Sequence, residues 1–97
     1  MRVISVKTLR EFWEGHRDAE GALRAWHSEA KNAQWKTSQD ILARHNSTDI
    51  LPGNRAVFNI KGNKYRLVVM IHYNSGKVYI RFVGTHAEYD RIDAERI

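Results

Sequence analysis

Hydrophobic and polar residues alternate with a period of two between residues 56 and 90, a pattern typical of β-strands that bury one face. The alternation predicts three antiparallel strands that lead into a short segment at residues 85–90. A two-residue turn is predicted at Gly62-Asn63, because glycine suits the first position of a type II′ turn. The predicted core face consists of Phe58, Ile60, Tyr65, Leu67, Val69, Ile71, Tyr73, Val78, Ile80 and Phe82.

The second turn of this sheet is predicted at Ser75-Gly76, with Asn74-Ser75 as the alternative. The alternative is expected to move Arg81 onto the core face, where an unpaired guanidinium would be very costly. The pattern therefore favours Ser75-Gly76. Together the two turns predict these cross-strand pairs: Asn59 with Arg66, Lys61 with Lys64, Met70 with Arg81, and Arg66 with Thr85.

The opposite face of the predicted sheet is cationic, because side chains alternate between the two faces of a strand. A randomly solvated surface would scatter both signs of charge, whereas here the basic residues gather on one side. This face carries Asn59, Lys61, Lys64, Arg66, Arg81 and Thr85 around the apolar residues Val57, Val68, Met70 and Val83.

The N-terminal half has helical periodicity. Residues 2–4 are predicted as an edge strand and residues 5–15 as a first helix. Asp18 is a predicted N-cap for a second helix, and Ser38 is a predicted cap for a third helix that ends near Arg44. Residues 45–55 are predicted as a loop. The apolar stripes consist of Leu9, Phe12, Trp13 and His16 in the first helix, and of Ala22, Leu23, Trp26, Ala30 and Ala33 in the second.

The chain of 97 residues is expected to form one domain over residues 1–97, with an α+β fold and its N-terminal helices packed on one face of a small antiparallel sheet. It contains no cysteine and no hydrophobic run as long as a membrane span, which suits a cytoplasmic protein. No histidines or carboxylates have metal-ligand spacing, so neither a metal nor another cofactor is expected. The net charge of +5 favours an anionic partner such as nucleic acid or the ribosome.

The cationic face offers the donors that an RNA phosphate needs. Arginine can bind two phosphate oxygens at once, so Arg66 and Arg81 are candidates to stabilise charge on a phosphorane. Lys61 and Lys64 are candidates to hold neighbouring phosphates. A purely solubilising role for these cations is the alternative at this point.

A candidate proton carrier lies where the last strand leaves the sheet. Metal-free RNA cleavage requires a base for the 2′-hydroxyl and an acid for the 5′-leaving oxygen. Histidine has an unperturbed pKa that suits proton transfer near neutrality, which makes His86 the first candidate. Tyr89 and Asp90 follow at i+3 and i+4, so one helical turn would bring both beside it. Alternatively, His86 caps a last helix and Tyr89 packs against the first one.

Two segments of the chain resemble the HigB toxins of bacterial toxin–antitoxin pairs: VFNIKGNKYRLV at residues 57–68 and YIRFVGTHAEYD at residues 79–90. The N-terminal half, with LREFW at residues 9–13 and AW at 25–26, is also similar. The resemblance implies a RelE-like fold and an mRNA endonuclease that acts in the ribosomal A site. It also implies a cognate helix-turn-helix antitoxin of the HigA type.

The resemblance also implies roles for individual residues. Arg66 matches an arginine of the RelE-type active surface, and Asn59 and Lys61 match a polar alternation where related toxins place lysines. His86 occupies the position at which HigB-type toxins carry a histidine, and Tyr89 is nearest to a terminal tyrosine of that group. Because Asn59 replaces a second lysine, the identity of the general base stays open.

Three functions remain compatible with the sequence. The first is a ribosome-dependent mRNA endonuclease toxin, and the second is a non-catalytic module that binds RNA or the ribosome with the same basic face. The third is a domain whose basic face binds an acidic protein. The cluster of His86, Tyr89 and Asp90 favours the enzyme, because binding alone needs no proton carrier.

Overall fold

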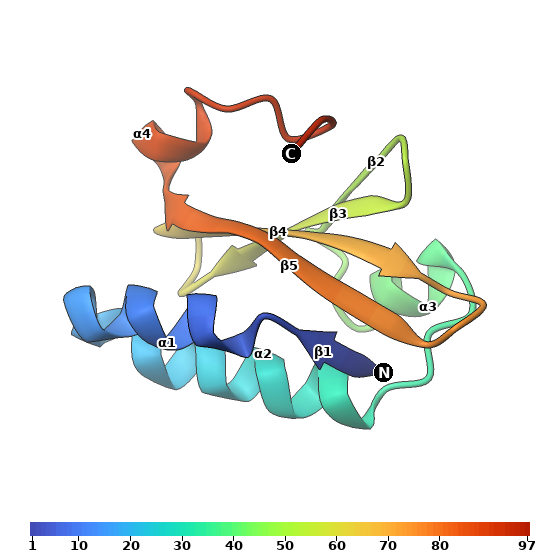
Figure 1. Cartoon of the computed structure of the whole chain (residues 1–97). Helices are drawn as coiled ribbons and strands as arrows, with labels where there is room; N and C mark the ends of the chain where they lie inside the picture. Colours follow the sequence, from blue (N-terminus) through green and yellow to red (C-terminus); the bar gives the residue numbers. More distant parts are fainter.

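The structure, a computed structural model that describes residues 1–97, is built on a five-stranded sheet. β3 (Arg55–Ile60), β4 (Tyr65–His72) and β5 (Lys77–Thr85) are antiparallel neighbours, which confirms the three predicted strands. β1 (Arg2–Ile4) pairs in parallel with β5, as the expected edge strand, and β2 (Asp49–Leu51) pairs with β3. The strand order is β1-β5-β4-β3-β2 (Figure 1).

Two helices cover one face of this sheet, as predicted. α1 (Val6–Gly15) and α2 (Glu20–Asn32) lie below the strands in Figure 1, and the shorter α3 (Ser38–Leu42) follows them in the chain. Because their apolar stripes meet the alternating residues of the strands, one continuous core forms. It includes Leu9, Trp13, Leu23, Trp26, Trp35, Ile41, Phe58, Ile60, Tyr65, Leu67, Val69, Ile71, Val78 and Ile80.

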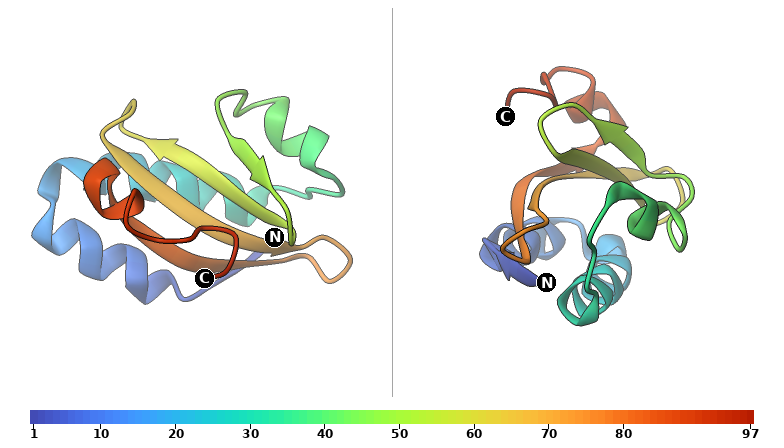
Figure 2. Two further views of the ribbon diagram at one scale, coloured as in Figure 1. Left: turned by 90° about the horizontal axis from the view of Figure 1, so that it is seen from above. Right: turned by 90° about the vertical axis from the view of Figure 1, so that its right-hand side faces the viewer.

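The C-terminal segment covers part of the opposite face, which the sequence had indicated as a cationic surface. After α4 (His86–Tyr89) the chain runs back over the strands, above the sheet in Figure 1 and in the right-hand view of Figure 2. Arg55 fastens its end, because Nε and Nη2 donate to the Ile97 backbone oxygen at 2.9 and 2.6 Å. The small second core beneath it consists of Val57, Val68 and Ala94, with Leu51, Phe82, Tyr89, Ile92 and Ile97 packed against them.

The β3–β4 connection has the predicted register, with Asn59 opposite Arg66. The Lys64 backbone N–H donates to the Lys61 carbonyl oxygen at 3.2 Å and closes the turn. Gly62 has φ 65°, and Lys61 itself has φ 52°, a left-handed conformation that is uncommon outside glycine.

The β4–β5 connection differs from the prediction. Residues 73–76 form a four-residue loop centred on Asn74-Ser75, so His72 pairs with Lys77 and Met70 pairs with Tyr79 instead of Arg81. The loop is closed by a backbone hydrogen bond of 2.9 Å from residue 76 to residue 72. This is the register of the Asn74-Ser75 alternative, and the expectation that it would move Arg81 onto the core face is wrong. Arg81 stays exposed, because a shift of two residues in register leaves each side chain on its original face.

A β-bulge in β5 makes a second correction. Val69 pairs with Ile80 and Val68 pairs with Phe82, which leaves Arg81 as the extra residue. Beyond the bulge each β5 side chain changes face, so Phe82 joins the second core, and Val83 packs against the main one. The two-residue shift at the loop and the one-residue bulge together place Arg66 opposite Gly84, so the predicted pairing with Thr85 is wrong.

Three local predictions for the chain before β3 are also wrong. Asp18 does not cap α2, because a 3₁₀ turn, η1 (Arg17–Ala19), comes first and Ala19 is the N-cap residue. The expected loop at residues 45–55 contains β2, since this segment folds back along β3. The third helix is capped by Thr37, with Asp40 in its first turn, and ends two residues before the expected Arg44.

Candidate functional site

Arg66 lies near the start of β4 on the face opposite α1 and α2, and two neighbours fix its guanidinium group. Nη1 donates to Asp49 Oδ2 at 3.0 Å, and the guanidinium carbon lies 5.0 Å from the centroid of the Tyr89 ring. Only 18% of the side chain is exposed, whereas Asp49 is 56% exposed. Arg66 Nε is buried without a hydrogen-bond partner. The group is therefore oriented by a carboxylate and an aromatic face, the two partners that suit a planar cation.

α4 exists because its first turn is capped twice. The Thr85 backbone N–H donates to Glu88 Oε1 at 2.8 Å, and the Glu88 backbone N–H donates to Thr85 Oγ1 at 3.2 Å. The hydrogen bond from the Thr85 N–H holds the pKa of Glu88 below its ordinary value. This capping box sets the direction in which α4 leaves the sheet, and thereby the positions of His86 and Tyr89.

Gly84 permits α4 to fold this closely onto the strand. A Cβ atom at this position would lie 2.6 Å from the Phe82 ring and 3.0 Å from Glu88 Oε1. Real Cβ atoms do not approach other atoms as closely as 2.6 Å, so a side chain here would push the ring or the turn away. The close approach of Glu88 to the strand therefore depends on the glycine.

The structure brings only some of the proposed catalytic residues together. Tyr89 stacks on Arg66, and His86 begins the same helical turn, with its Nε2 atom buried and without a hydrogen-bond partner. Asp90 follows the turn, where its side chain is exposed, and its backbone N–H donates to the His86 carbonyl oxygen at 2.9 Å. Arg81 is exposed in the bulge and makes no ion pair.

The predicted RNA-binding residues lie beside this group, at and before the β3–β4 turn. Asn59 is the cross-strand partner of Arg66, and its Nδ2 atom donates to the Ser47 carbonyl oxygen at 3.3 Å. Lys61 and Lys64 are exposed at the turn, yet both contact Asp18. The cations of this surface are thus partly neutralised within the protein, which the sequence did not indicate.

Asp18 binds three groups of the β3–β4 hairpin. Oδ2 pairs with Lys64 Nζ and lies 3.6 Å from Lys61 Nζ, and Oδ1 accepts a hydrogen bond of 2.6 Å from the Tyr65 hydroxyl. The hydrogen bond from Lys64, followed by that from Tyr65, holds the pKa of Asp18 well below its ordinary value. The same carboxylate raises the pKa values of Lys64 and Tyr65.

Asp18 and Asp49 are the residues that sequence reasoning missed at this surface. Each carboxylate is distant in sequence from the cation that it binds. The separation is 46 residues between Asp18 and Lys64 and 17 residues between Asp49 and Arg66. The only signal in the sequence was a surplus of cations on one strand face, which calls for acidic partners without identifying them.

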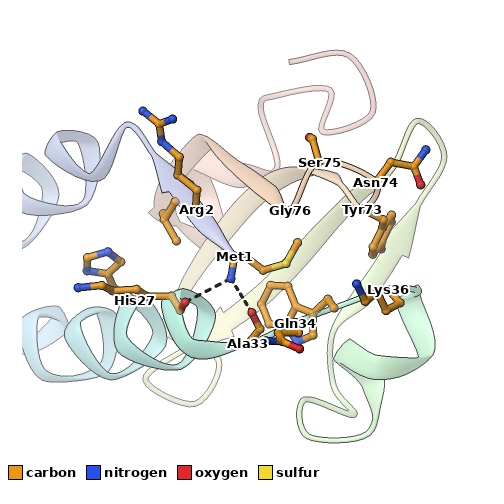
Figure 3. Close-up of a pocket in the computed structure, with 13 residues that line it drawn as sticks. Met1, Arg2, His27, Ala33, Gln34, Lys36, Tyr73, Asn74, Ser75 and Gly76 are labelled. Atoms are coloured by element: carbon orange, nitrogen blue, oxygen red, sulfur yellow. Dashed lines mark hydrogen bonds between the residues drawn. The ribbon is translucent and has the colours of Figure 1, made fainter.

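The largest cavity, about 800 Å³, lies at the other end of β4 and is shown in Figure 3. It is bordered by β1, the end of α2 and the β4–β5 loop, and none of the proposed site residues lines it. Met1 is one of the residues that line it and donates from its amino group to the Ala33 carbonyl oxygen at 2.5 Å (Figure 3). The labelled residues around it include Arg2, His27, Lys36 and Tyr73.

The structure contains neither a group of metal-binding side chains nor a membrane-spanning helix. No three histidine, aspartate or glutamate side chains lie close enough together to hold a metal ion. None of the four α-helices combines the length and hydrophobicity needed to cross a bilayer.

Comparison with known proteins identifies the family. A family profile described as the RelE-like toxic component of a toxin–antitoxin system, HigB_toxin, matches residues 19–92. The chain belongs to the HigB toxin family. The matched region contains α2, all of the antiparallel strands and α4, so the α+β architecture is the RelE-like fold of the HigB toxin family. Membership of a toxin–antitoxin family also implies an antitoxin partner.

Three curated relatives support this assignment. The mRNA interferase toxin HigB of Escherichia coli K12 is 33% identical over 92 residues, which cover 93% of this chain and 88% of the relative. The mRNA interferase HigB proteins of Escherichia coli O157:H7 and Shigella flexneri match with the same identity and coverage. The similarity to the HigB toxins therefore extends over nearly the whole chain.

Proposed function

We propose that this protein is an mRNA endonuclease toxin that cleaves translated messages in the ribosomal A site and thereby stops translation and growth. The relatives named as mRNA interferases support the reaction class. The observation that carries the proposal is the oriented guanidinium of Arg66, which stacks on Tyr89 beside the turn that begins with His86. This arrangement supplies a phosphate donor and a titratable group at one end of the sheet.

The proposed reaction needs no metal ion. A base removes the proton of the RNA 2′-hydroxyl, whose oxygen attacks the adjacent phosphorus atom while the bond to the 5′-oxygen breaks. An acid gives that leaving oxygen its proton. Arg66, with donors left over after its bond to Asp49, stabilises the charge that develops on the phosphorane. The products are a cyclic phosphate on one fragment and a 5′-hydroxyl on the other.

We assign proton transfer to the α4 turn. His86 is the proposed first carrier, because near neutral pH an imidazole can accept a proton and the resulting imidazolium can donate it. Tyr89 orients Arg66 and, with Asp90, is the alternative carrier. Arg81 is assigned a supporting contact to RNA because it is exposed and unpaired, and Asn59, Lys61 and Lys64 are assigned to the RNA backbone.

Asp49 joins this assignment as a positioning residue. It touches Arg66 through Nη1 and fixes the plane of the guanidinium, which leaves Nη2 to bind a phosphate oxygen. Without Asp49, only the contact with the Tyr89 ring would orient the guanidinium.

The partners follow from the same proposal. The net charge of +5 favours the ribosome and its message, and we propose that a helix-turn-helix antitoxin of the HigA type neutralises the toxin. The site of action is then the cytoplasm, where translation takes place.

The test is to add purified protein to a reconstituted translation system and to map the ends of the message. We expect cuts within the translated region that carry 5′-hydroxyl ends and that are absent when the same message is not translated. Ribosome binding without any cut would contradict the proposal and favour a non-catalytic RNA-binding module with the same basic surface.

A further inference from the structure

The carboxylate of Asp18 occupies Lys61 and Lys64, two of the cations proposed above to bind the RNA backbone. One of its oxygens is shared by two ammonium groups, Lys64 Nζ in direct contact and Lys61 Nζ at 3.6 Å. Its other oxygen accepts from the Tyr65 hydroxyl at 2.6 Å. Two cations and a hydroxyl converging on one anion are a set of donors that also suits a phosphate group.

The position of Asp18 in the chain makes this contact unusual. Aspartate is one of the favoured N-cap residues, yet the cap of α2 is Ala19, which makes no side-chain hydrogen bond. Asp18, one residue earlier, lies in η1 and reaches across to the hairpin instead. The start of α2 thus lacks the cap that its neighbour could provide, while the hairpin gains a carboxylate.

The hairpin is shaped to meet this carboxylate. Lys61 adopts a left-handed backbone conformation with φ 52°, and its side chain is directed to the same oxygen that Lys64 binds. Both lysines remain about half exposed, at 48% and 58%. An ammonium group has three donors, so each lysine can still meet solvent or a phosphate on its outer side.

We propose that Asp18 is an internal competitor for the RNA backbone, which occupies Lys61 and Lys64 in the free protein and yields them to a phosphate of bound RNA. This proposal rests on the function proposed above. The consequence is a preference for RNA on the ribosome. Free RNA must displace the carboxylate of Asp18 from the two lysines, and it therefore binds weakly. An RNA held by the ribosome against the same surface loses less freedom on binding, so it meets this cost more easily.

A purely structural role for Asp18 makes a different prediction. The Tyr65 hydroxyl is attached to a buried ring and needs an acceptor, which Asp18 provides. If this were its only purpose, an uncharged acceptor would serve equally well and RNA affinity would not change. Asp18→Asn separates the two roles, because its amide oxygen can accept from Tyr65 but carries no charge.

The experiment measures binding of a single-stranded RNA with 2′-O-methyl groups, which has no 2′-hydroxyl to attack and cannot be cleaved, across a range of salt concentrations. We expect Asp18→Asn to bind roughly three- to tenfold more tightly at low salt, since the two exposed ion pairs that RNA must otherwise break are weak. The slope of log K against log salt should steepen by about 0.7 for each further phosphate that the variant neutralises. The matched control is Glu20→Gln, which removes one negative charge two residues away, from a carboxylate bound to Arg24 instead.

The proposal is overturned if Asp18→Asn behaves like Glu20→Gln, or if it binds RNA more weakly than the parent. The tighter binding should also vanish when Lys61→Ala and Lys64→Ala are added, and an effect that persists without the lysines would equally overturn it. Urea unfolding checks that the variants fold, and Asp18→Ser is the second variant if the amide folds poorly. Cleavage of translated message by the parent is scored separately, so a protein that fails to cleave but still shows the Asp18→Asn effect contradicts only the proposed function.

Discussion

Arg66 illustrates how the site depends on side chains from outside its own strand. β4 supplies the guanidinium, β2 supplies Asp49 and α4 supplies Tyr89, so three elements meet at one group. The two neighbours restrict the guanidinium together, since the carboxylate holds Nη1 and the Tyr89 ring lies against the group. An arginine held in this way loses little further rotamer entropy when a phosphate arrives.

Replacement of Asp49 by alanine should therefore lower kcat more than it alters KM. A misplacement of about 1 Å can cost on the order of 100-fold in rate, so we expect a loss of roughly 10- to 100-fold. This loss in cleavage rate is measured by single-turnover cleavage of message on stalled ribosomes. Glu11→Ala, which changes an exposed carboxylate of α1 outside the site, should cleave like the parent. An unchanged kcat in Asp49→Ala would show that Arg66 needs no such partner.

Asp18 should make the stability of the protein sensitive to acid. Its pKa is depressed in the folded state, so its contribution is present above the unfolded pKa near pH 4 and is lost as the pH falls further. Urea midpoints between pH 2 and pH 7 should therefore fall more steeply below about pH 4 in the parent than in Asp18→Asn. Parallel curves for the two proteins would contradict the coupling between Asp18 and the hairpin.

The positions of the candidate site residues could be predicted only where spacing within a short stretch of sequence determines them. The i, i+3 relation placed His86 and Tyr89 on one turn, and the Gly62-Asn63 turn paired Asn59 with Arg66; α4 and this register are both observed. The carboxylates of Asp18 and Asp49 could not be found in this way, because their contacts depend on how η1 and β2 pack against the hairpin. Whether His86 carries the proton stays a prediction.

Among the secondary-structure elements, α4 is the one whose placement decides the proposed activity. It has only four residues, so its capping box and the absence of a side chain at Gly84 hold it, rather than its own helical propensity.

Gly84→Ala should therefore destabilise the protein by about 1–3 kcal/mol, the usual cost of overpacking. It should also reduce cleavage, because the displaced turn carries His86 and Tyr89. Gly21→Ala is the control: nothing lies within 4 Å of its Cβ, and in α2 the change should stabilise by about 0.4–1 kcal/mol. Urea unfolding gives both values, and a neutral Gly84→Ala would mean that α4 is not held by this close approach.

The strands show where counting from turns fails. The β3–β4 register followed from one glycine-containing turn, but the β4–β5 register required both a loop length and a bulge. A bulge adds one residue without a sequence signature of its own, and here it places Phe82 and Val83 on faces opposite to those expected. The β2 strand was missed because its three residues lie inside a segment whose turn-forming residues, including Pro52-Gly53, indicated a loop.

The protein as a whole is a sheet with a large core below and a small one above. The upper core leaves the β3–β4 turn exposed and Arg66 partly exposed beside Tyr89, and these residues form the proposed RNA surface.

The two faces should respond differently to a buried charge. Val69 is fully buried among α1, α2 and the strands, so Val69→Asp should cost several kcal/mol and unfold a domain whose total stability is about 5–15 kcal/mol. Met70, half-buried on the other face, should tolerate aspartate far better. Circular dichroism with urea titration distinguishes the two variants, and equal losses would mean that the faces are misassigned.

His86 decides whether this surface is catalytic or only binds RNA. His86→Gln removes the titratable group but keeps hydrogen-bonding capacity, and general acid–base contributions are typically about 10²–10⁴-fold, so single-turnover cleavage of ribosome-bound message should fall by about that factor. Ribosome affinity should barely change, and His72→Gln, at the exposed far end of β4, should cleave like the parent. If His86→Gln, Tyr89→Phe and Asp90→Asn all cleave at the parental rate, the account of this site as a proton-transfer centre is contradicted.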